Sequence, residues 1–318
     1  MGAPSVILRS LSLRRMIQPR APPSMVAPLP EKSRFDERLT AELDTLRPPQ
    51  QGSAGLIRFL DASIAAQKIA LGMLVNIPYR DDTDRGALEH YLETNVEILD
   101  SCNHLSDKIE IVKKYLDSLR VVLRFVDGSF SSRMRAMEHL ESIRGIERKC
   151  KSVSKRNGLR RILRQKLGHY ESELGEIMSG SKAMALMACE FLELGLSFDS
   201  KRRIPTITES QRSRSSSSWL RMLLELVNQE EGSEKTQRRR CVSHLIMEDL
   251  RETVRSVRDL EEVMKGKRER EVKSAVEGLK RKCRGLEDEI EIVEERVKDL
   301  YRSLIDVRMA VLGILSQA

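Results

Sequence analysis

The chain has 318 residues, of which 40% are hydrophobic, 33% charged and 4% aromatic. This apolar content can fill a core and argues against disorder throughout, and the charged residues favour long helices with solvated outer faces over sheets. Lysine and arginine exceed aspartate and glutamate by 56 − 48 = 8, which favours an acidic partner surface, although both signs are interspersed along most of the chain.

The cysteines and the apolar runs exclude further classes of protein. The five cysteines are far apart in sequence and form no C-x-x-C pair, which predicts a reducing compartment without a disulfide framework or a zinc site. The most apolar stretch, 183–198, is interrupted by Glu190 and Glu193. A buried core helix is therefore favoured there over a membrane span.

Residues 1–30 differ in composition from the rest of the chain, since they contain arginines and prolines but no acidic residue. Such a segment cannot contribute to a core. It is typical either of an organellar transit peptide, which would direct the chain to a plastid, or of an untargeted disordered tail.

Two helices are predicted before residue 80. The first carries an apolar stripe and ends at Pro48, and the second begins at Ser53 and stops near Pro78. The stripes are Phe35, Leu39, Leu43 and Leu46 in the first and Leu56, Leu60, Ile64, Ile69 and Met73 in the second.

A much longer helix is predicted to begin near Asp84 and to end at Gly128. Its apolar residues alternate steps of four and three, a period that a strand cannot produce. They are Ile98, Cys102, Leu105, Ile109, Val112, Leu116, Leu119, Leu123 and Val126. Shorter helices are expected over 131–155, 158–178 and 181–198, before a serine- and arginine-rich stretch, 199–218, that is typical of an exposed linker. Trp219 then opens a further helix, which Gly232 interrupts.

The last stretch carries the most regular pattern, with steps of four and three from Val272 to Ile314. Its members are Val272, Val276, Leu279, Cys283, Leu286, Ile290, Val293, Val297, Leu300, Leu304, Val307, Val311 and Ile314. At about 1.5 Å per residue this helix spans roughly 64 Å. Its length matches that of the earlier long helix, so the two can lie side by side.

A heptad seam can face another helix of the same chain or a second chain. Beyond Val297 the apolar face widens through Tyr301, Met309, Ala310, Leu312 and Leu315, so we expect that half to be covered on more than one side. An internal, monomeric bundle is therefore favoured over a homodimeric coiled coil. The sequence predicts an all-α fold, an elongated antiparallel helical bundle with two long heptad-patterned helices. Its parts are a tail (1–30), a first bundle part (31–198), the linker (199–218) and a second bundle part (219–318).

No common phosphate-binding, nucleophile-elbow or zinc-protease motif occurs, and the histidines fall singly on separate predicted helices. We therefore expect no enzyme activity, no cofactor and no metal site. A basic cluster around Gly158 is a candidate for contacts with phosphate or lipid headgroups, through Arg156, Arg160, Arg161 and Arg164. Nucleic acid is less favoured because no aromatic residues interleave with this cluster.

Two linker serines are candidates for phosphorylation. Arg212 and Arg214 stand three residues before Ser215 and Ser217, a spacing that basic-directed kinases accept. A phosphate there would neutralise part of the positive charge of the linker.

The segment Tyr91–Ser106, with Leu99, Asp100, Cys102 and Asn103 in that order, resembles a helix of plant BYPASS-type (BPS1-like) proteins. The ending Leu300–Leu315 is similar to the C-terminus of that family, and Phe35–Leu46 resembles its first helix. The resemblance implies a helical plant protein of root and shoot development in a family that restrains a mobile root-derived signal. It also implies a link to the exocytosis machinery, and it supplies no catalytic residues.

These observations lead to two functional hypotheses. The first is a cytoplasmic regulatory or scaffold protein that binds a protein partner and contacts an anionic endomembrane peripherally. The alternative is a basic, nucleic-acid-associated or nuclear helical protein.

Overall fold

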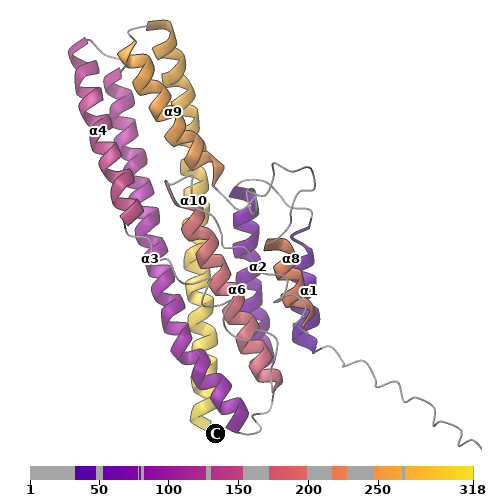
Figure 1. Ribbon diagram of the computed structural model, residues 1–318. Helices are drawn as coiled ribbons and strands as arrows, with labels where there is room; N and C mark the ends of the chain where they lie inside the picture. The colour runs from indigo at the N-terminus through magenta and orange to yellow at the C-terminus, as the bar shows by residue number, and fades with distance from the viewer. Residues whose placement is uncertain are drawn as a thin grey trace, which may run out of the picture. The chain divides into compact units, whose positions relative to one another are not determined.

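Long α-helices that lie alongside one another make up the described part of the chain (Figure 1). The computed structural model describes residues 33–47, 53–77, 79, 82–126, 130–152, 172–198, 217–227, 247–266 and 269–317, all within one compact unit, Lys32–Ala318. The helices are α1 (Arg34–Asp44), α2 (Ser53–Leu74), α3 (Asp82–Val126), α4 (Phe130–Ser152), α6 (Glu173–Gly195), α8 (Ser218–Val227), α9 (Glu248–Lys265) and α10 (Glu269–Gln317). These ranges contain no strand, and the prediction of an all-α bundle is confirmed.

The two heptad-patterned helices, α3 and α10, pack against each other in opposite directions. The amide of Asn95 lies 3.5 Å from the carbonyl oxygen of Leu304, and the ammonium of Lys113 lies 2.6 Å from Glu294 Oε2, so numbers rise on one helix as they fall on the other. With 45 and 49 residues the helices span about 68 and about 74 Å. Every predicted seam residue on both is buried, apart from the half-buried Ile314.

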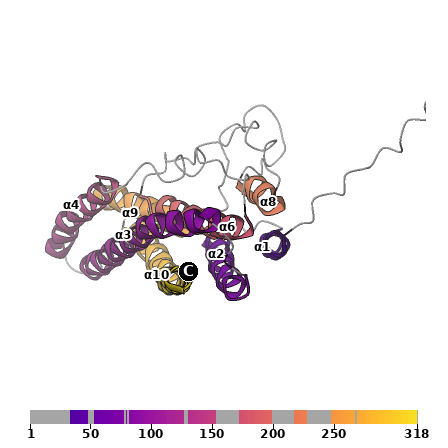
Figure 2. The same cartoon turned by 90° about the horizontal axis from the view of Figure 1, so that it is seen from below.

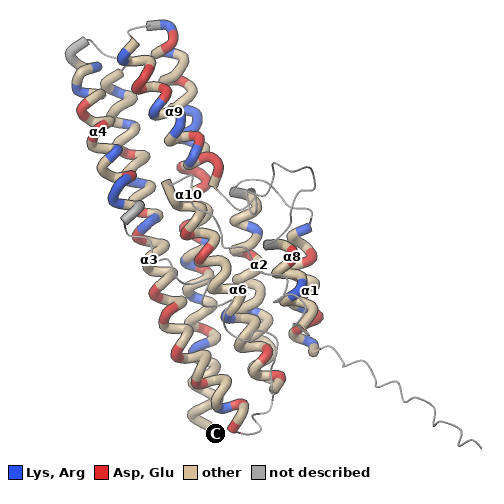
Figure 3. The backbone as a smooth tube through the Cα atoms, in the orientation of Figure 1, with Lys and Arg blue, Asp and Glu red and all other residues tan. Residues whose placement is uncertain are grey.

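Apolar burial dominates the energetics of this central pair. Each leucine, isoleucine or valine removed from water contributes about 1.5–3 kcal/mol, whereas an exposed ion pair contributes about 0–1 kcal/mol. Charged residues of both signs are interspersed along the helices (Figure 3). Those that flank the α10 seam pair with three different helices, as Arg120–Glu287 and Lys113–Glu294 with α3, Lys282–Glu252 with α9 and Arg296–Asp61 with α2.

The expected covering of the C-terminal half of α10 is found only in part. Tyr301, Ala310 and Leu315 are half-buried, but Met309 is 61% exposed and Leu312 39% exposed. The reason is that α2 and α3 occupy the inner sides of this half, while α9 forms a hairpin with the other end of α10. Seen from below, α10 lies at the margin of the bundle (Figure 2).

The prediction of a helix boundary between residues 178 and 181 is wrong, because α6 runs without interruption from Glu173 to Gly195. Gly180 lies inside the helix at a close contact. A Cβ atom there would clash with the ring of Phe35, 2.8 Å from Cζ, and would lie 3.4 Å from Trp219 Cζ2. Glycine at this position therefore leaves space for two aromatic rings, one from α1 and one from α8, and does not end the helix.

Helix α6 is surrounded by other helices, with contacts to α2 and α3. Most of its side chains from Leu174 onwards are buried, so the interpretation of 183–198 as a core helix is confirmed. Among the helices that the structure describes, none combines the length and apolarity that crossing a membrane requires.

Candidate functional site along the contact of α3 with α6

Two of the four described cysteines and two of the three described histidines lie where α3 contacts α6. Contacts run from His90–Lys182 through Cys102–Cys189 to Lys108–Glu193, so numbers rise together and the two helices are parallel. We call this contact the α3–α6 seam, defined by His90, Cys102, His104, Lys108, Lys182, Cys189 and Glu193. It contains the Cys102 that belongs to the segment resembling BYPASS-type proteins.

A buried ion pair lies at the end of the seam that is nearer the C-termini of α3 and α6. Lys108 Nζ lies 2.5 Å from Glu193 Oε1, and the two residues are 1% and 8% exposed. His104 Nε2 approaches the other carboxylate oxygen at 3.6 Å. Burying either charge alone would be costly, so the pair specifies which turn of α3 meets which turn of α6. Since both groups are paired and shielded from solvent, neither can reach a substrate.

The two thiols in the middle of the seam face each other, with Cys102 Sγ 3.9 Å from Cys189 Sγ. The hydrogen bond between the two thiols, together with burial, holds the pKa of Cys189 well above its usual value. Both cysteines are free thiols, and a neutral buried thiol is a poor nucleophile. The two residues are 87 positions apart, and no sequence signal could have brought them together.

Further polar side chains lie at the end of the seam that is nearer the N-termini of α3 and α6. His90 Nε2 lies 3.1 Å from Lys182 Nζ. Burial and the neighbouring ammonium lower the pKa of His90, so the neutral ring accepts a hydrogen bond from Lys182. One residue away, Ser181 Oγ donates to Gln67 Oε1 at 2.5 Å while Gln67 Nε2 donates back to the Ser181 carbonyl at 2.8 Å. These bonds satisfy polar groups inside the core and tie α2 to α6.

Among the described residues, no group of three or more His, Cys, Asp or Glu side chains lies close enough to hold an ion. His139 lies on α4, stacked on Phe125 with ring centroids 5.3 Å apart. The described histidines therefore do not converge.

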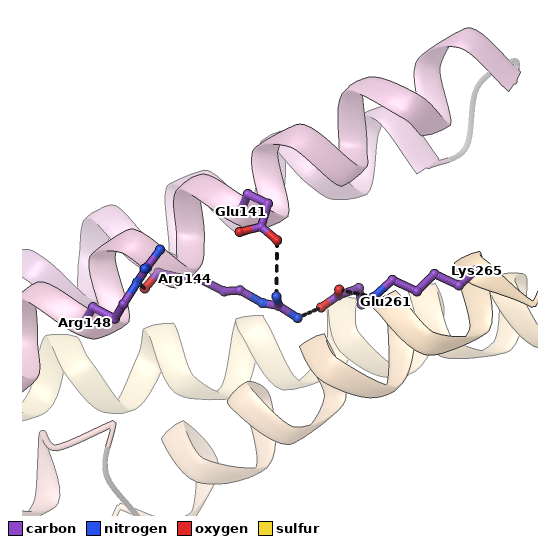
Figure 4. A network of polar contacts seen from close by, with 5 residues as sticks. All are labelled: Glu141, Arg144, Arg148, Glu261 and Lys265. Atoms are coloured by element: carbon purple, nitrogen blue, oxygen red, sulfur yellow. Dashed lines mark hydrogen bonds and ion pairs between the residues drawn. The ribbon is translucent and has the colours of Figure 1, made fainter.

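A second charged network joins α4 to α9 (Figure 4). Arg144 lies between Glu141, at 3.2 Å, and Glu261, which also accepts from Lys265 Nζ at 2.7 Å. Burial alone would raise the pKa of Glu261, but Lys265 and Arg144 outweigh it and lower that pKa. Arg148 Nε donates to the carbonyl of Arg144. This network joins two helices, and it contains no thiol, hydroxyl or imidazole group.

A junction of helix beginnings forms a third polar cluster, which the sequence did not reveal. Ser33, Asp36, Glu176, Ser217 and Trp219 meet there, and we call it the α1–α6–α8 junction. Asp36 Oδ1 accepts from the backbone N–H of Trp219 at 2.7 Å, and Ser217 Oγ donates to Glu176 Oε1 at 3.3 Å. Burial first, and then the nearby Asp36 carboxylate, raise the pKa of Glu176.

The residues singled out from the sequence have different fates in the structure. Arg156, Arg160, Arg161, Arg164 and Ser215 lie outside the described residues, as do residues 1–30. Ser217 is described, and it is buried at the start of α8 rather than exposed in a linker. Its phosphorylation stays a prediction.

One known protein family matches the part of the chain that contains α3 and α6. A family model described as Protein BPS1 matches residues 80–314, which is more than half of the chain. The matched range begins just before α3 and extends into the last turns of α10, so it contains the α3–α6 seam. Neither curated proteins nor solved structures match this chain.

Proposed function

This chain belongs to the BPS1 family, and from that premise we propose that it is a non-enzymatic regulator of plant development that acts as a helical scaffold. Membership of the family supports the developmental role. The proposal goes further in three respects. The chain restrains a mobile root-derived signal, it acts through a protein partner such as a component of the exocytosis machinery, and it works in the cytoplasm with peripheral contact to an endomembrane.

One surface feature carries the proposal of a protein contact. The inner seam of α10 is already filled by its own chain, yet large apolar side chains remain exposed on the opposite side. They belong to a set spaced four and three apart, which we call the outer stripe of α10, namely Glu291, Glu295, Lys298, Arg302, Ile305, Met309 and Leu312. All of these except the half-buried Ile305 are exposed.

The outer stripe has the pattern of a helix-packing surface. It is charged at Glu291 and Arg302 and becomes apolar at Met309 and Leu312, so a partner helix could be placed in one register by charge and held by apolar burial. Because α10 is about 74 Å long and packed along its inner face, it would present this stripe as a rigid rod. A scaffold requires such a surface and no reactive group.

The experiment compares full-length variants in a plant line that lacks the protein. Met309→Asp/Leu312→Asp places charges on the outer stripe, whereas Met134→Asp places one on α4, at a methionine that is 55% exposed against 61% for Met309. We expect the wild type and Met134→Asp to restore root and shoot growth and the double variant to fail, with all three equally helical by circular dichroism. Full rescue by the double variant would exclude the outer stripe as the contact surface.

A grafting experiment addresses the signal. A wild-type shoot on a root that lacks the protein should stop growing, and a root expressing the wild-type chain should release it. Normal growth of the shoot on the deficient root would refute the restraint of a root-derived signal.

Two further measurements address compartment and partner class. Imaging the full-length chain beside one lacking residues 1–30 should show the same cytoplasmic distribution for both, and movement from a plastid to the cytosol would establish the transit peptide instead. Titrating salt against binding to anionic liposomes and to duplex or single-stranded nucleic acid separates the alternatives. Selective binding of nucleic acid would favour the nucleic-acid-associated function.

A further inference from the structure

Helices α1 and α8 form a pair that docks on α6 through two aromatic rings. Phe35 of α1 and Trp219 of α8 are both fully buried, and both pack at Gly180. At the other end of the pair, Arg47, which follows the end of α1, forms an ion pair with Glu225 of α8. We call this docked pair the α1–α8 latch. It is short, since α1 has 11 residues and α8 has 10, so tertiary contacts rather than helix propensity hold it in place.

Two carboxylates lie where the latch meets α6. The carbonyl of Ser217 accepts the first backbone bond of α8, from Arg221, which places Ser217 at the N-cap. Its hydroxyl donates to Glu176 on α6, and the backbone N–H of Trp219, two residues further on, donates to Asp36 on α1. The docked arrangement therefore requires a small, uncharged side chain at position 217.

The sequence places the same serine in a kinase context. Arg214 stands three residues before it, in the run Arg212-Ser-Arg-Ser-Ser-Ser-Ser-Trp219. Basic-directed kinases accept arginine at this spacing. Sequence motif and structural position thus converge on one hydroxyl.

We propose that phosphorylation of Ser217 opens the α1–α8 latch. A basic-directed protein kinase transfers the γ-phosphoryl group of ATP to Ser217 Oγ, the hydroxyl proton is released and ADP leaves. Because Ser217 is only 5% exposed, the kinase acts on the latch while α8 is transiently undocked. The phosphate then prevents α8 from docking again.

The charges decide the direction of the effect. A helix N-terminus carries the equivalent of about half a positive charge, which attracts a phosphate. The docked position, however, would bring a phosphate of about −1.5 to −2 charges against the carboxylates of Glu176 and Asp36, in a buried site. It would also replace the donor that Glu176 accepts from. Repulsion and desolvation therefore outweigh the attraction of the helix, and the undocked state is favoured.

The chain contains its own reporter, because Trp219 is its single tryptophan and it lies two residues from Ser217. In the full-length wild type, its emission should be blue-shifted and poorly quenched by acrylamide. Ser217→Glu should shift the emission to the red and raise the quenching towards that of the urea-unfolded chain. Ser217→Ala, which removes the hydroxyl without adding charge, should stay close to the wild type.

Ser218→Glu is the matched control, since Ser218 is the first residue of α8 and is only half-buried. A charge there faces the same helix N-terminus, so it should leave Trp219 shielded. Equal exposure of Trp219 in both glutamate variants would overturn the proposal, as would shielding in Ser217→Glu. Glu176→Gln in the Ser217→Glu background should restore part of the shielding, which a merely misfolded variant would not do. Circular dichroism should show that α3 and α10 stay helical throughout.

The modification itself is tested on the full chain with a basic-directed kinase and Mg-ATP. Peptide mapping by mass spectrometry should find phosphate on Ser217, Trp219 should become exposed in step with its incorporation, and a phosphatase should reverse both changes. Phosphate confined to Ser215, or phosphate on Ser217 with Trp219 still shielded, would refute the proposed switch.

Discussion

Replacing Lys108 with methionine should destabilise the protein far more than removing an ordinary surface lysine. Lys108 is 1% exposed, and its ammonium lies 2.5 Å from Glu193, a residue that is itself only 8% exposed. Methionine fills the space of the aliphatic stem but leaves the Glu193 carboxylate buried without its ammonium partner. Breaking a buried pair in this way costs about 3–5 kcal/mol. Total stabilities of domains are about 5–15 kcal/mol, so this is a large fraction.

The matched controls separate the ion pair from the loss of a charge as such. Lys298 on α10 pairs with Glu294 at 2.8 Å but is 56% exposed, so Lys298→Met should cost about 0–1 kcal/mol. In Lys108→Met/Glu193→Leu the stranded charge is gone, and its stability should return close to that of the wild type. The free energy of unfolding is measured by urea titration with circular dichroism at 25 °C.

Measuring the single variant Glu193→Leu as well completes a double-mutant cycle, and two outcomes would refute the reasoning. If Lys108→Met costs no more than Lys298→Met, the buried pair does not contribute as its geometry indicates. If the double variant loses the sum of the two single losses, the residues are not coupled.

Three other predictions follow from particular contacts. Gly180→Ala should lower the free energy of unfolding by about 1–3 kcal/mol, because the added Cβ would meet the ring of Phe35. Gly278→Ala in α10 should raise the free energy of unfolding by about 0.5–1 kcal/mol, because nothing lies within 4 Å of the added Cβ. Thermal unfolding compares the two variants, and equal effects would contradict the close contact at Gly180. Leu300→Asp puts a charge at a fully buried position of the seam and should unfold the unit. If the variant stays helical but light scattering shows particles smaller than those of the wild type, the seam forms an intermolecular coiled coil instead. Because the pKa of Glu176 is raised in the docked state, docking favours the protonated carboxyl, and the latch should weaken as the pH rises from the ordinary value of 4.5 through the raised pKa. Acrylamide quenching of Trp219 at different pH values measures this weakening. Glu176→Gln, which retains Asp36, should remove most of the pH dependence of the quenching.

Local periodicity accounts for what could be predicted from the sequence. A 4-3 spacing of apolar residues specifies both that a segment is helical and which of its faces is buried, because both follow from residues a few positions apart. The seams from Ile98 to Val126 and from Val272 to Val311 are buried as expected. Glu190 and Glu193 correctly marked α6 as a core helix, since two carboxylates are too costly inside a bilayer.

Where the sequence misled, a distant neighbour changed the meaning of a local signal. Gly180 has the properties of a helix end, but the rings of Phe35 and Trp219 require a glycine inside α6. Ser217 lies in a run typical of a linker, yet it is buried and its hydroxyl donates a hydrogen bond to Glu176. The widened apolar face at Met309 predicted a neighbouring helix, and none of those described covers it. Helix α9 was not separated from the region before α10, because its pattern is shorter and less regular.

The sequence by itself therefore determined the helices, their buried faces and the absence of familiar catalytic motifs. Only the tertiary structure decided which faces meet, and with them the contacts of Cys102 with Cys189, Lys108 with Glu193 and Ser217 with Glu176. These pairs join residues 41 to 87 positions apart. Helical period is a property of neighbouring residues, whereas the choice of partner depends on how whole helices fill space together.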